Sequence, residues 1–218
     1  MNSINLGQVK SVNLDAMTVK PRRSGQHHGD LRNALEQAAL ELVAERGPHG
    51  FTLAEACRRA GVSVSAPYKH FADRDALLAS LAARSYRDQH ARFGRAIESG
   101  EDAEGRLAAF AVAYVRFAAE ERALFDVAFG AGLDLAAHPE LAEAGTALRD
   151  LLLPVARLVV VAEADALDLI VSVAAAAHGL AVYLQQGMLQ PEAEPLAAAE
   201  RRADRMARAV VRQSSACR

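Results

Sequence analysis

The hydrophobic residues of this chain recur every three or four positions over most of its length, which is the period of an α-helix. Between residues 30 and 45 they form one unbroken stripe that includes Leu31, Leu35 and Leu42. A pair of short helices should follow within residues 52–70. The same spacing predicts further helices over residues 73–97, 103–120, 139–160, 165–186 and 196–212, with a short one around residues 124–129. We therefore expect an all-α protein.

Residues 51–78 carry a more specific pattern, in which two short helical segments flank a glycine. Thr52 stands three residues before Glu55, which is the spacing of a capping box, so a helix should begin there. Gly61 can adopt the left-handed backbone that ends this helix, and Ser63 can cap the next one. The pair predicts a helix-turn-helix, whose second helix enters the major groove of DNA.

The second helix of this pair, residues 63–70, is rich in hydroxyl and basic side chains, which reach phosphates and base edges. Pro67 lacks a backbone donor, so we expect this helix to be short. The alternative is that its polar side chains are exposed to solvent and contact no DNA. Our candidate DNA contacts are Arg22, Arg23, Thr52, Ser63, Ser65, Ala66, Tyr68, Lys69, His70 and Arg74.

In these residues the chain resembles the tetracycline-repressor (TetR) family of bacterial regulators. The matching elements are Glu45-Arg46-Gly47, Thr52-Leu53, Ala60-Gly61-Val62-Ser63, Tyr68-Lys69-His70-Phe71 and Arg74-Asp75-Ala76-Leu77-Leu78. Their order and spacing agree over roughly fifty residues, which is more specific than one short motif. The resemblance implies a homodimeric regulator, most simply a repressor, that binds a palindromic DNA operator and responds to a small molecule.

The resemblance also implies an effector cavity in the C-terminal part, where Tyr114 and the pair His178-Gly179 match one branch of the family. The effector should be largely apolar, because this region offers few polar groups. The alternative is plain core packing, with His178 as a hydrogen-bonded core histidine. The candidate ligand contacts are Phe110, Tyr114, Phe117, Phe125, Phe129 and His178.

A dimer interface is expected over residues 165–212. The helix at 165–186 is apolar nearly all round, which fits a helix that is buried on both sides. The last helix combines an apolar stripe with an arginine-rich face that we interpret as solvated. A charge introduced at Ala174 or Ala181 is expected to break the dimer, because it would be buried without a partner.

The charge of the 218-residue chain is close to balanced at −2, but it is unevenly spread. Residues 1–90 hold 12 Lys and Arg against 9 Asp and Glu, whereas residues 91–218 hold 13 against 18. A basic N-terminal part suits a surface that faces DNA. We expect a disordered basic arm over residues 1–26, a helix-turn-helix domain over 27–72 and a ligand-binding and dimerisation domain over 73–218.

Other classes of protein find little support in the sequence. Two cysteines are too few for a disulfide framework, and no Cys/His/Asp cluster suggests a metal site. The mostly apolar run at residues 169–184 is shorter than the roughly twenty residues that span a bilayer. The first 26 residues lack the apolar core of a signal peptide, so we expect a cytoplasmic protein without a membrane partner.

The sequence contains no catalytic constellation, so we expect no enzymatic activity and no cofactor. Two alternatives from other classes stay open. One is a helical interaction or scaffold protein that has kept a helix-turn-helix without reading specific DNA. The other is a small helical enzyme that uses the aromatic pocket.

Overall fold

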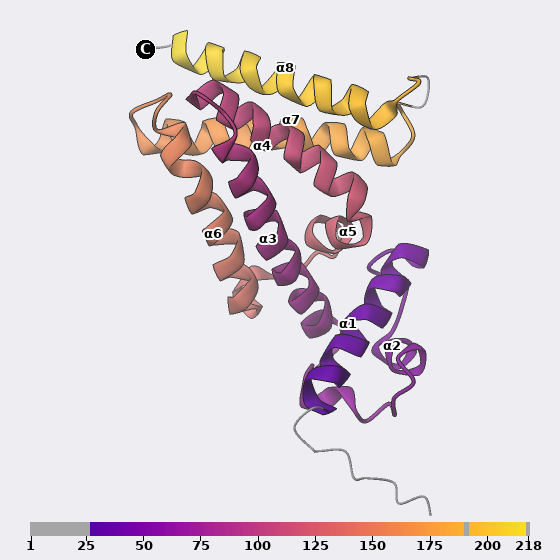
Figure 1. The fold of residues 1–218 in the computed structure, drawn as a ribbon. Helices are drawn as coiled ribbons and strands as arrows, with labels where there is room; N and C mark the ends of the chain where they lie inside the picture. Colours follow the sequence, from indigo (N-terminus) through magenta and orange to yellow (C-terminus); the bar gives the residue numbers. More distant parts are fainter. Residues whose placement is uncertain (1–26, 190–191, 217–218) are drawn as a thin grey trace, which may run out of the picture.

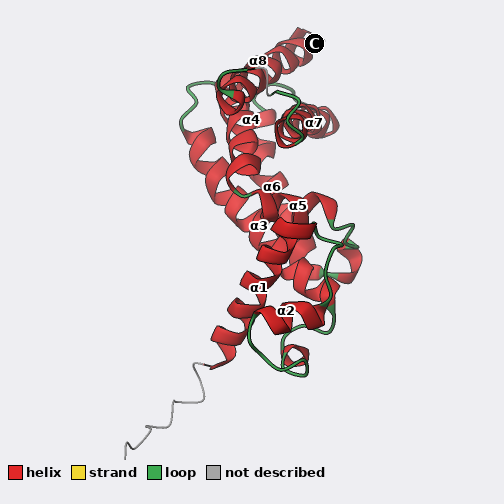
Figure 2. Ribbon diagram, turned by 90° about the vertical axis from the view of Figure 1, so that its right-hand side faces the viewer, coloured by secondary structure: helices red, strands yellow, loops and turns green. Residues whose placement is uncertain are grey.

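The computed structural model describes residues 27–189 and 192–216, and this part of the chain contains helices and loops but no strand (Figures 1 and 2). The all-α prediction is therefore confirmed. The first elements are α1 (His27–Arg46), α2 (Leu53–Arg59), the 3-10 helix η1 (Pro67–Lys69) and α3 (Arg74–Glu98). They are followed by α4 (Ala103–Glu120), α5 (Arg122–Gly130), the 3-10 helix η2 (Leu135–Ala137), α6 (Pro139–Ala156), α7 (Glu163–Gln185) and α8 (Pro195–Ala216).

The molecule is elongated, with α1 and α2 at one end and α7 and α8 at the other (Figure 1). The long helix α3 runs between the two ends, and α6 lies beside it (Figure 1). Helices α4, α7 and α8 pack on one another at the far end. The segment that follows α2 therefore lies far from α8.

Two hydrophobic cores stabilise this arrangement, and α3 contributes to both. Leu77 and Leu81, in the first half of α3, are fully buried in a core with α1 and α2. Phe93 and Ile97, near its end, belong to a second core with α4, α6, α7 and α8. Val127 of α5 also belongs to the first core, so its contacts extend beyond the domain boundary expected at residue 72.

The capping box predicted at the start of α2 is present. The backbone N–H of Thr52 donates to a carboxylate oxygen of Glu55 over 2.8 Å, and the Glu55 N–H donates to the Thr52 hydroxyl over 3.3 Å. The hydrogen bond from the Thr52 backbone lowers the pKa of Glu55. After α2, Gly61 has a φ of 69°, the left-handed conformation expected for the glycine that ends this helix.

The second helix of the predicted pair is not an α-helix. Residues 63–70 contain only the 3-10 helix η1, which has three residues. Pro67 has no N–H to donate to the carbonyl of Ser63, and that carbonyl instead accepts from Ala66 over 3.0 Å. The Ser63 hydroxyl, expected to cap a helix, lies 3.2 Å from the hydroxyl of Ser65. The side chains of this segment are therefore presented from a turn.

Helix α7 differs from a fully enclosed core helix. Among the described residues it is the one helix that is long and apolar enough, by length and composition alone, to cross a membrane. Core helices of soluble proteins meet the same criterion, and α7 packs against α4, α6 and α8. Only 33% of its most apolar 18-residue window is buried within the protomer, so much of its apolar surface is left uncovered.

The capping box gives a prediction about stability. Replacing Thr52 with alanine should lower the free energy of unfolding by about 1 kcal/mol, because the Glu55 N–H loses its acceptor at the first turn of α2. Urea unfolding monitored by circular dichroism measures this change. Thr146→Ala is the matched control, since Thr146 is exposed within α6 and alanine favours helix interiors. An equal loss in both variants would contradict the capping role.

Candidate nucleic-acid interface and effector cavity

The segment between α2 and α3 exposes four of the predicted DNA contacts: Ser63, Ser65, Tyr68 and Lys69. The Tyr68 side chain is 63% exposed, which is unusual for a large aromatic residue. Within the described part of the chain, Lys69 makes no ion pair or hydrogen bond. These groups are free to meet phosphates and base edges.

The other predicted contacts are placed differently. Ala66 and His70 are half-buried, and Arg74 is half-buried with its guanidinium 3.1 Å from the carboxylate of Asp75. Thr52 is exposed, but its hydroxyl takes part in the capping box. Arg22 and Arg23, with the rest of the predicted arm at residues 1–26, lie outside the described residues.

Val64 is an exposed residue of this segment that the sequence did not single out. Its side chain is 51% exposed, next to the exposed serines. An apolar side chain on a DNA-facing surface can contact the methyl group of thymine. A valine in a helical pattern is typical of a core, so the sequence carried no signal for this role.

Ion pairs fix α2 against α1 beneath this segment. Arg59 of α2 donates to the carboxylate of Glu45 over 2.8 Å, and Arg46 of α1 donates to Glu55 over 3.0 Å. The pairing with Arg59 lowers the pKa of Glu45. These arginines therefore orient α2, which leaves Lys69 as the exposed cation of the segment that follows it.

A buried polar network holds the end of η1. Arg32 of α1 donates to the Ser80 hydroxyl over 2.6 Å, and that hydroxyl donates to Glu36 over 2.8 Å. The Arg32 guanidinium also lies over the ring of Phe71, 5.2 Å from its centre. The network joins α1, α3 and Phe71, the second residue after η1. This network was not predicted from the sequence. The spacing of four residues between Arg32 and Glu36 was the one local signal for it.

The predicted effector residues divide into two groups. Tyr114, Phe125, Phe129 and His178 contact one another, and the Tyr114 hydroxyl lies 3.0 Å from Nδ1 of His178. The His178 ring lies 5.3 Å from that of Phe125 and 5.2 Å from that of Phe129. Four residues from α4, α5 and α7 thus form one aromatic cluster.

Phe110 and Phe117 face a different part of the molecule. Both are almost fully buried, and both pack edge-on against Phe93 of α3, at 5.0 and 6.5 Å between ring centres. The guanidinium of Arg92 lies 5.5 Å from the centre of the Phe117 ring. Phe93 also stacks on Tyr114 at 5.8 Å, and the Phe110 ring packs edge-on against Tyr114 at 6.1 Å, so the two groups are in contact.

A cavity of about 300 Å³ lies against the aromatic cluster. It is lined by Pro48, His49, Phe125, Asp126, Phe129, Gly130, His178, Val182 and Gln185. His49, in the turn between α1 and α2, donates from Nε2 to the Gly130 carbonyl at the end of α5 over 2.9 Å. One wall of the cavity thus belongs to the N-terminal part and the others to the C-terminal part. No local pattern in the sequence indicated His49 or Asp126 for this role.

Burial shifts the pKa values of three ionisable groups in and next to this cavity. It lowers the pKa of His178, so the imidazole is uncharged near neutral pH. It raises the pKa of Tyr114 well above its usual value, which keeps the phenol protonated. Burial also raises the pKa of Asp126, more than the charge of Arg122 lowers it.

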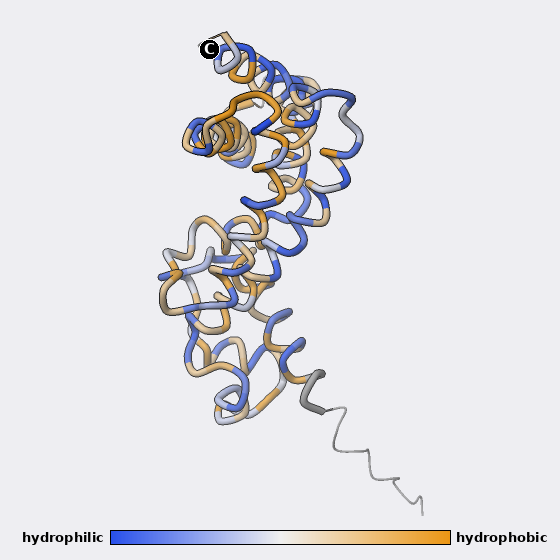
Figure 3. Tube along the Cα trace, turned by 90° about the vertical axis from the view of Figure 1, so that its left-hand side faces the viewer, coloured by the Kyte–Doolittle hydropathy of each residue, from blue (hydrophilic) through white to orange (hydrophobic). Residues whose placement is uncertain are grey.

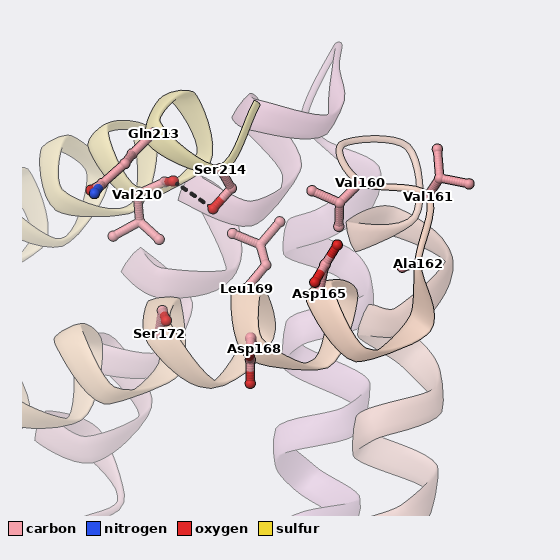
Figure 4. Close-up of a pocket in the computed structure, with 10 residues that line it drawn as sticks. All are labelled: Val160, Val161, Ala162, Asp165, Asp168, Leu169, Ser172, Val210, Gln213 and Ser214. Carbon is pink, nitrogen blue, oxygen red and sulfur yellow. Dashed lines mark hydrogen bonds between the residues drawn. The ribbon is translucent and has the colours of Figure 1, made fainter. Parts of the chain in front are cut away.

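A larger cavity, of about 700 Å³, lies at the far end between the start of α7 and the end of α8 (Figure 4). Its lining includes Leu169, Val210 and two acidic residues, Asp165 and Asp168, but none of the predicted effector contacts. Ser214 is turned toward the Val210 carbonyl, to which its hydroxyl donates over 3.0 Å (Figure 4). This hollow borders the exposed side of α7.

Two buried polar residues on α3 were also missed by the sequence analysis. Gln89 and Ser85 are both fully buried, and the Gln89 amide donates to the Ser85 hydroxyl over 3.1 Å. The amide oxygen of Gln89 has no hydrogen-bond partner within the described structure. Gln89 lies one turn before Phe93 and Ser85 one turn before Gln89, between the two hydrophobic cores.

Comparison with known proteins agrees with this architecture. Residues 36–81 match the family of bacterial regulatory proteins called tetR. Residues 107–210 match the tetracyclin repressor-like C-terminal domain. The two matches cover the segment with the exposed Tyr68 and Lys69 and most of the helices that carry the aromatic cluster. No curated protein sequence matches the chain.

Solved structures share the fold. A protein of unknown function from Rhodococcus sp. RHA1 is 35% identical with a TM-score of 0.65, and the match covers 84% of this chain and 98% of that one. A regulatory protein in the tetR family from Rhodococcus RHA1 is 21% identical with a TM-score of 0.64, covering 83% and 96%. The transcriptional regulator FadR from Bacillus subtilis, solved with stearoyl-CoA, is 16% identical with a TM-score of 0.63, covering 80% and 97%.

Along the chain, the N-terminal family match comes first and the C-terminal match second. The two parts of the structure follow in the same order. The exposed segment that carries the predicted DNA contacts and the helical domain with its cavity correspond to the two parts of a one-component regulator. The chain belongs to the TetR family of DNA-binding, ligand-responsive transcriptional regulators.

Proposed function

We propose that this regulator is a homodimeric repressor that binds a palindromic operator through residues 61–70 of each protomer. The observation that carries the proposal is the placement of two exposed surfaces at opposite ends of the molecule (Figure 1). Tyr68 and Lys69 lie at one end, and the uncovered apolar side of α7 lies at the other. A two-fold dimer through α7 and α8 presents both recognition segments to the same face of DNA.

The dimer surface consists of the outward sides of α7 and α8. Val171 and Tyr183 of α7 are 64% and 52% exposed, with the exposed small residue Ala175 between them. Met206 of α8 is 43% exposed. The trace of α7 is largely in the hydrophobic colours of Figure 3. An apolar surface of this kind normally marks an interface.

Ala174 and Ala181 are not specific test positions for that interface. Ala181 is fully buried within the protomer, and Ala174 packs against its core. A charge at either position would therefore disrupt the fold of the protomer as well as a dimer. Ala175 faces outward and separates the two effects.

The effector site in this proposal is the 300 Å³ cavity beside the aromatic cluster. Its volume is at the lower end of the range for ligand sites and suits a small, largely apolar molecule. The Bacillus regulator is solved with stearoyl-CoA, but an acyl-CoA carries several phosphates. No lysine or arginine lines this cavity among the described residues, so we do not extend that ligand to this chain.

Two contacts connect the cavity to the DNA-binding part. Phe129 packs edge-on against Tyr86 of α3, with 6.2 Å between ring centres. His49 bonds to the carbonyl at the end of α5. A ligand that moves Phe129 therefore shifts α3 and the α1–α2 turn together, and changes the separation of the recognition segments. It must favour the released state by several kcal/mol to shift most of the population.

The site geometry favours neither alternative function. The segment with exposed Tyr68 and Lys69 supports DNA reading over a scaffold role. Within the described residues, no group of three or more metal-ligating side chains occurs that could hold a metal ion. We propose that the protein acts in the cytoplasm, on DNA, without an enzymatic activity of its own.

The first prediction concerns DNA affinity. Binding to the palindrome upstream of its own gene should weaken as salt rises, and Lys69→Ala should lower the slope of log affinity against log salt by about two. The reason is that each of the two recognition segments of the dimer loses one phosphate contact. Arg95→Ala, an equal charge loss at an exposed position of α3 outside both the recognition segment and the dimer surface, should leave the slope unchanged. Fluorescence anisotropy measures both, and equal slopes for Lys69→Ala and wild type would remove Lys69 from the interface.

The second prediction concerns assembly. Ala175→Asp should convert the dimer to a monomer that keeps its helical content, because the carboxylate would be buried without a partner in the interface. Sedimentation equilibrium and far-UV circular dichroism measure the two properties. Ala147→Asp, on the exposed side of α6, is the control and should remain dimeric. A wild-type protein that is monomeric at micromolar concentration would contradict the proposed interface.

A further inference from the structure

The effector cavity contains a carboxylate that a purely apolar ligand would leave unused. Asp126 follows Phe125 on α5 and precedes Phe129 by three residues, so one side of this helix presents two aromatic rings and an acid. All three line the same 300 Å³ cavity, together with His178. The Asp126 side chain is 29% exposed, which leaves it within the cavity rather than free in solvent.

The negative charge of Asp126 is poorly compensated. Its nearest cation, Arg122, lies 3.9 Å away, and the Arg122 side chain is 66% exposed. Other carboxylates of this protein are held more closely, since Glu104 lies 2.7 Å from a guanidinium nitrogen of Arg212. No lysine or arginine lines the cavity within the described residues. A ligand can therefore supply the missing positive charge.

The aromatic rings beside this carboxylate on α5 provide a second attraction for a cation. The rings of Phe125 and Phe129 lie 4.9 Å apart, tilted by 48°. The His178 ring is stacked on Phe125 at 5.3 Å. Aromatic faces carry partial negative charge and attract ammonium groups within about 6 Å of the ring centre.

The neighbouring polar groups do not oppose a cation. Burial lowers the pKa of His178, so its imidazole brings no positive charge into the cavity. Gln185 gives its amide N–H to the carbonyl of Ala118 over 3.2 Å, which leaves the amide oxygen, an acceptor, for a ligand. Both groups are compatible with a ligand that carries positive charge or N–H donors.

We propose that the cavity between α5, α7 and the α1–α2 turn binds a small organic cation. The ligand class is a protonated amine or quaternary ammonium on an aromatic or branched apolar skeleton. Its charge lies against Asp126, and its skeleton packs on Phe125, Phe129 and His178. The inference rests on the proposed function in taking this cavity as the effector site. Because His49 forms another wall, such a ligand contacts the DNA-binding part directly.

The experiment compares probes that differ only in charge. Benzyltrimethylammonium and its uncharged carbon isostere, neopentylbenzene, have nearly the same shape and volume, and phenylacetate is an anion of similar size. Binding of each to the full-length protein is measured by isothermal titration calorimetry, with the isostere kept below its solubility limit. We expect the ammonium to bind at least about tenfold more tightly than either other probe. This comparison requires no variant.

A variant then assigns the preference to one carboxylate. Asp126→Asn should reduce affinity for the ammonium by about tenfold, while affinity for the isostere stays within about twofold. Asp150→Asn makes the same chemical change on exposed α6, outside the cavity, and should alter neither. Thermal unfolding of each variant shows whether its fold is intact. If Asp126→Asn does not fold, Asp126→Glu, which keeps the charge, should retain the ammonium preference.

The outcomes separate this inference from the proposed function. Equal binding of the ammonium and the isostere overturns the cation assignment while leaving the cavity as an effector site. An unchanged ammonium affinity in Asp126→Asn overturns the role of Asp126. If no probe binds but the operator is still bound with the expected salt slope, the cation site is overturned and the DNA-binding function stands. If the operator is not bound either, the proposed function itself fails.

Discussion

The burial of one long helix in two hydrophobic cores is the constraint on which the rest of the molecule depends. The first half of α3 contributes Leu77, Leu78 and Leu81 to the N-terminal core, and the second half contributes Phe93 and Ile97 to the C-terminal core. Fully burying a side chain of this size stabilises the fold by about 1.5–3 kcal/mol. Because a continuous helix is rigid over this length, a displacement at one core is carried to the other.

Two aromatic contacts join α3 to the aromatic cluster beside the cavity. Tyr86 lies on α3 between the two cores and packs against Phe129, while Phe93, two turns later, stacks on Tyr114. The buried pair Ser85 and Gln89 interrupts the apolar packing in the same stretch. A buried amide oxygen without a hydrogen-bond partner costs free energy, so this stretch is less favourably packed than the two apolar cores on either side of it. In the function proposed above, a ligand at the aromatic cluster acts on α3 next to this stretch.

The sequence predicted the helices because their stripes and caps are local features. The capping box at Thr52 and the left-handed Gly61 depend on residues a few positions apart, and both are present. The α-helix expected over residues 63–70 is wrong because Pro67 removes the hydrogen bond that would have continued it. Helix α7 was expected to be buried on both sides, one of them in a dimer interface; the protomer covers one side, and the burial of the other stays a prediction.

The candidate site was harder to predict from the sequence, because tertiary contacts assemble it. Tyr114 and His178 are 64 positions apart and meet through a hydrogen bond that no local pattern encodes. Phe110 and Phe117 share the helix of Tyr114 and its spacing, yet their rings pack on another side. His49 and Asp126 are single polar residues in otherwise ordinary segments, and only the fold brings them to one cavity.

In the proposed dimer, two copies of this chain hold their recognition segments one turn of DNA apart. Spin labels at Ala72→Cys, an exposed position beside the segment that is not one of the predicted contacts, in a chain that also carries Cys57→Ala and Cys217→Ser, permit this distance to be measured by double electron–electron resonance. With operator bound, we expect a narrow distribution centred at about 34 Å. The absence of dipolar coupling, or a distance unrelated to the helical repeat of DNA, would contradict it.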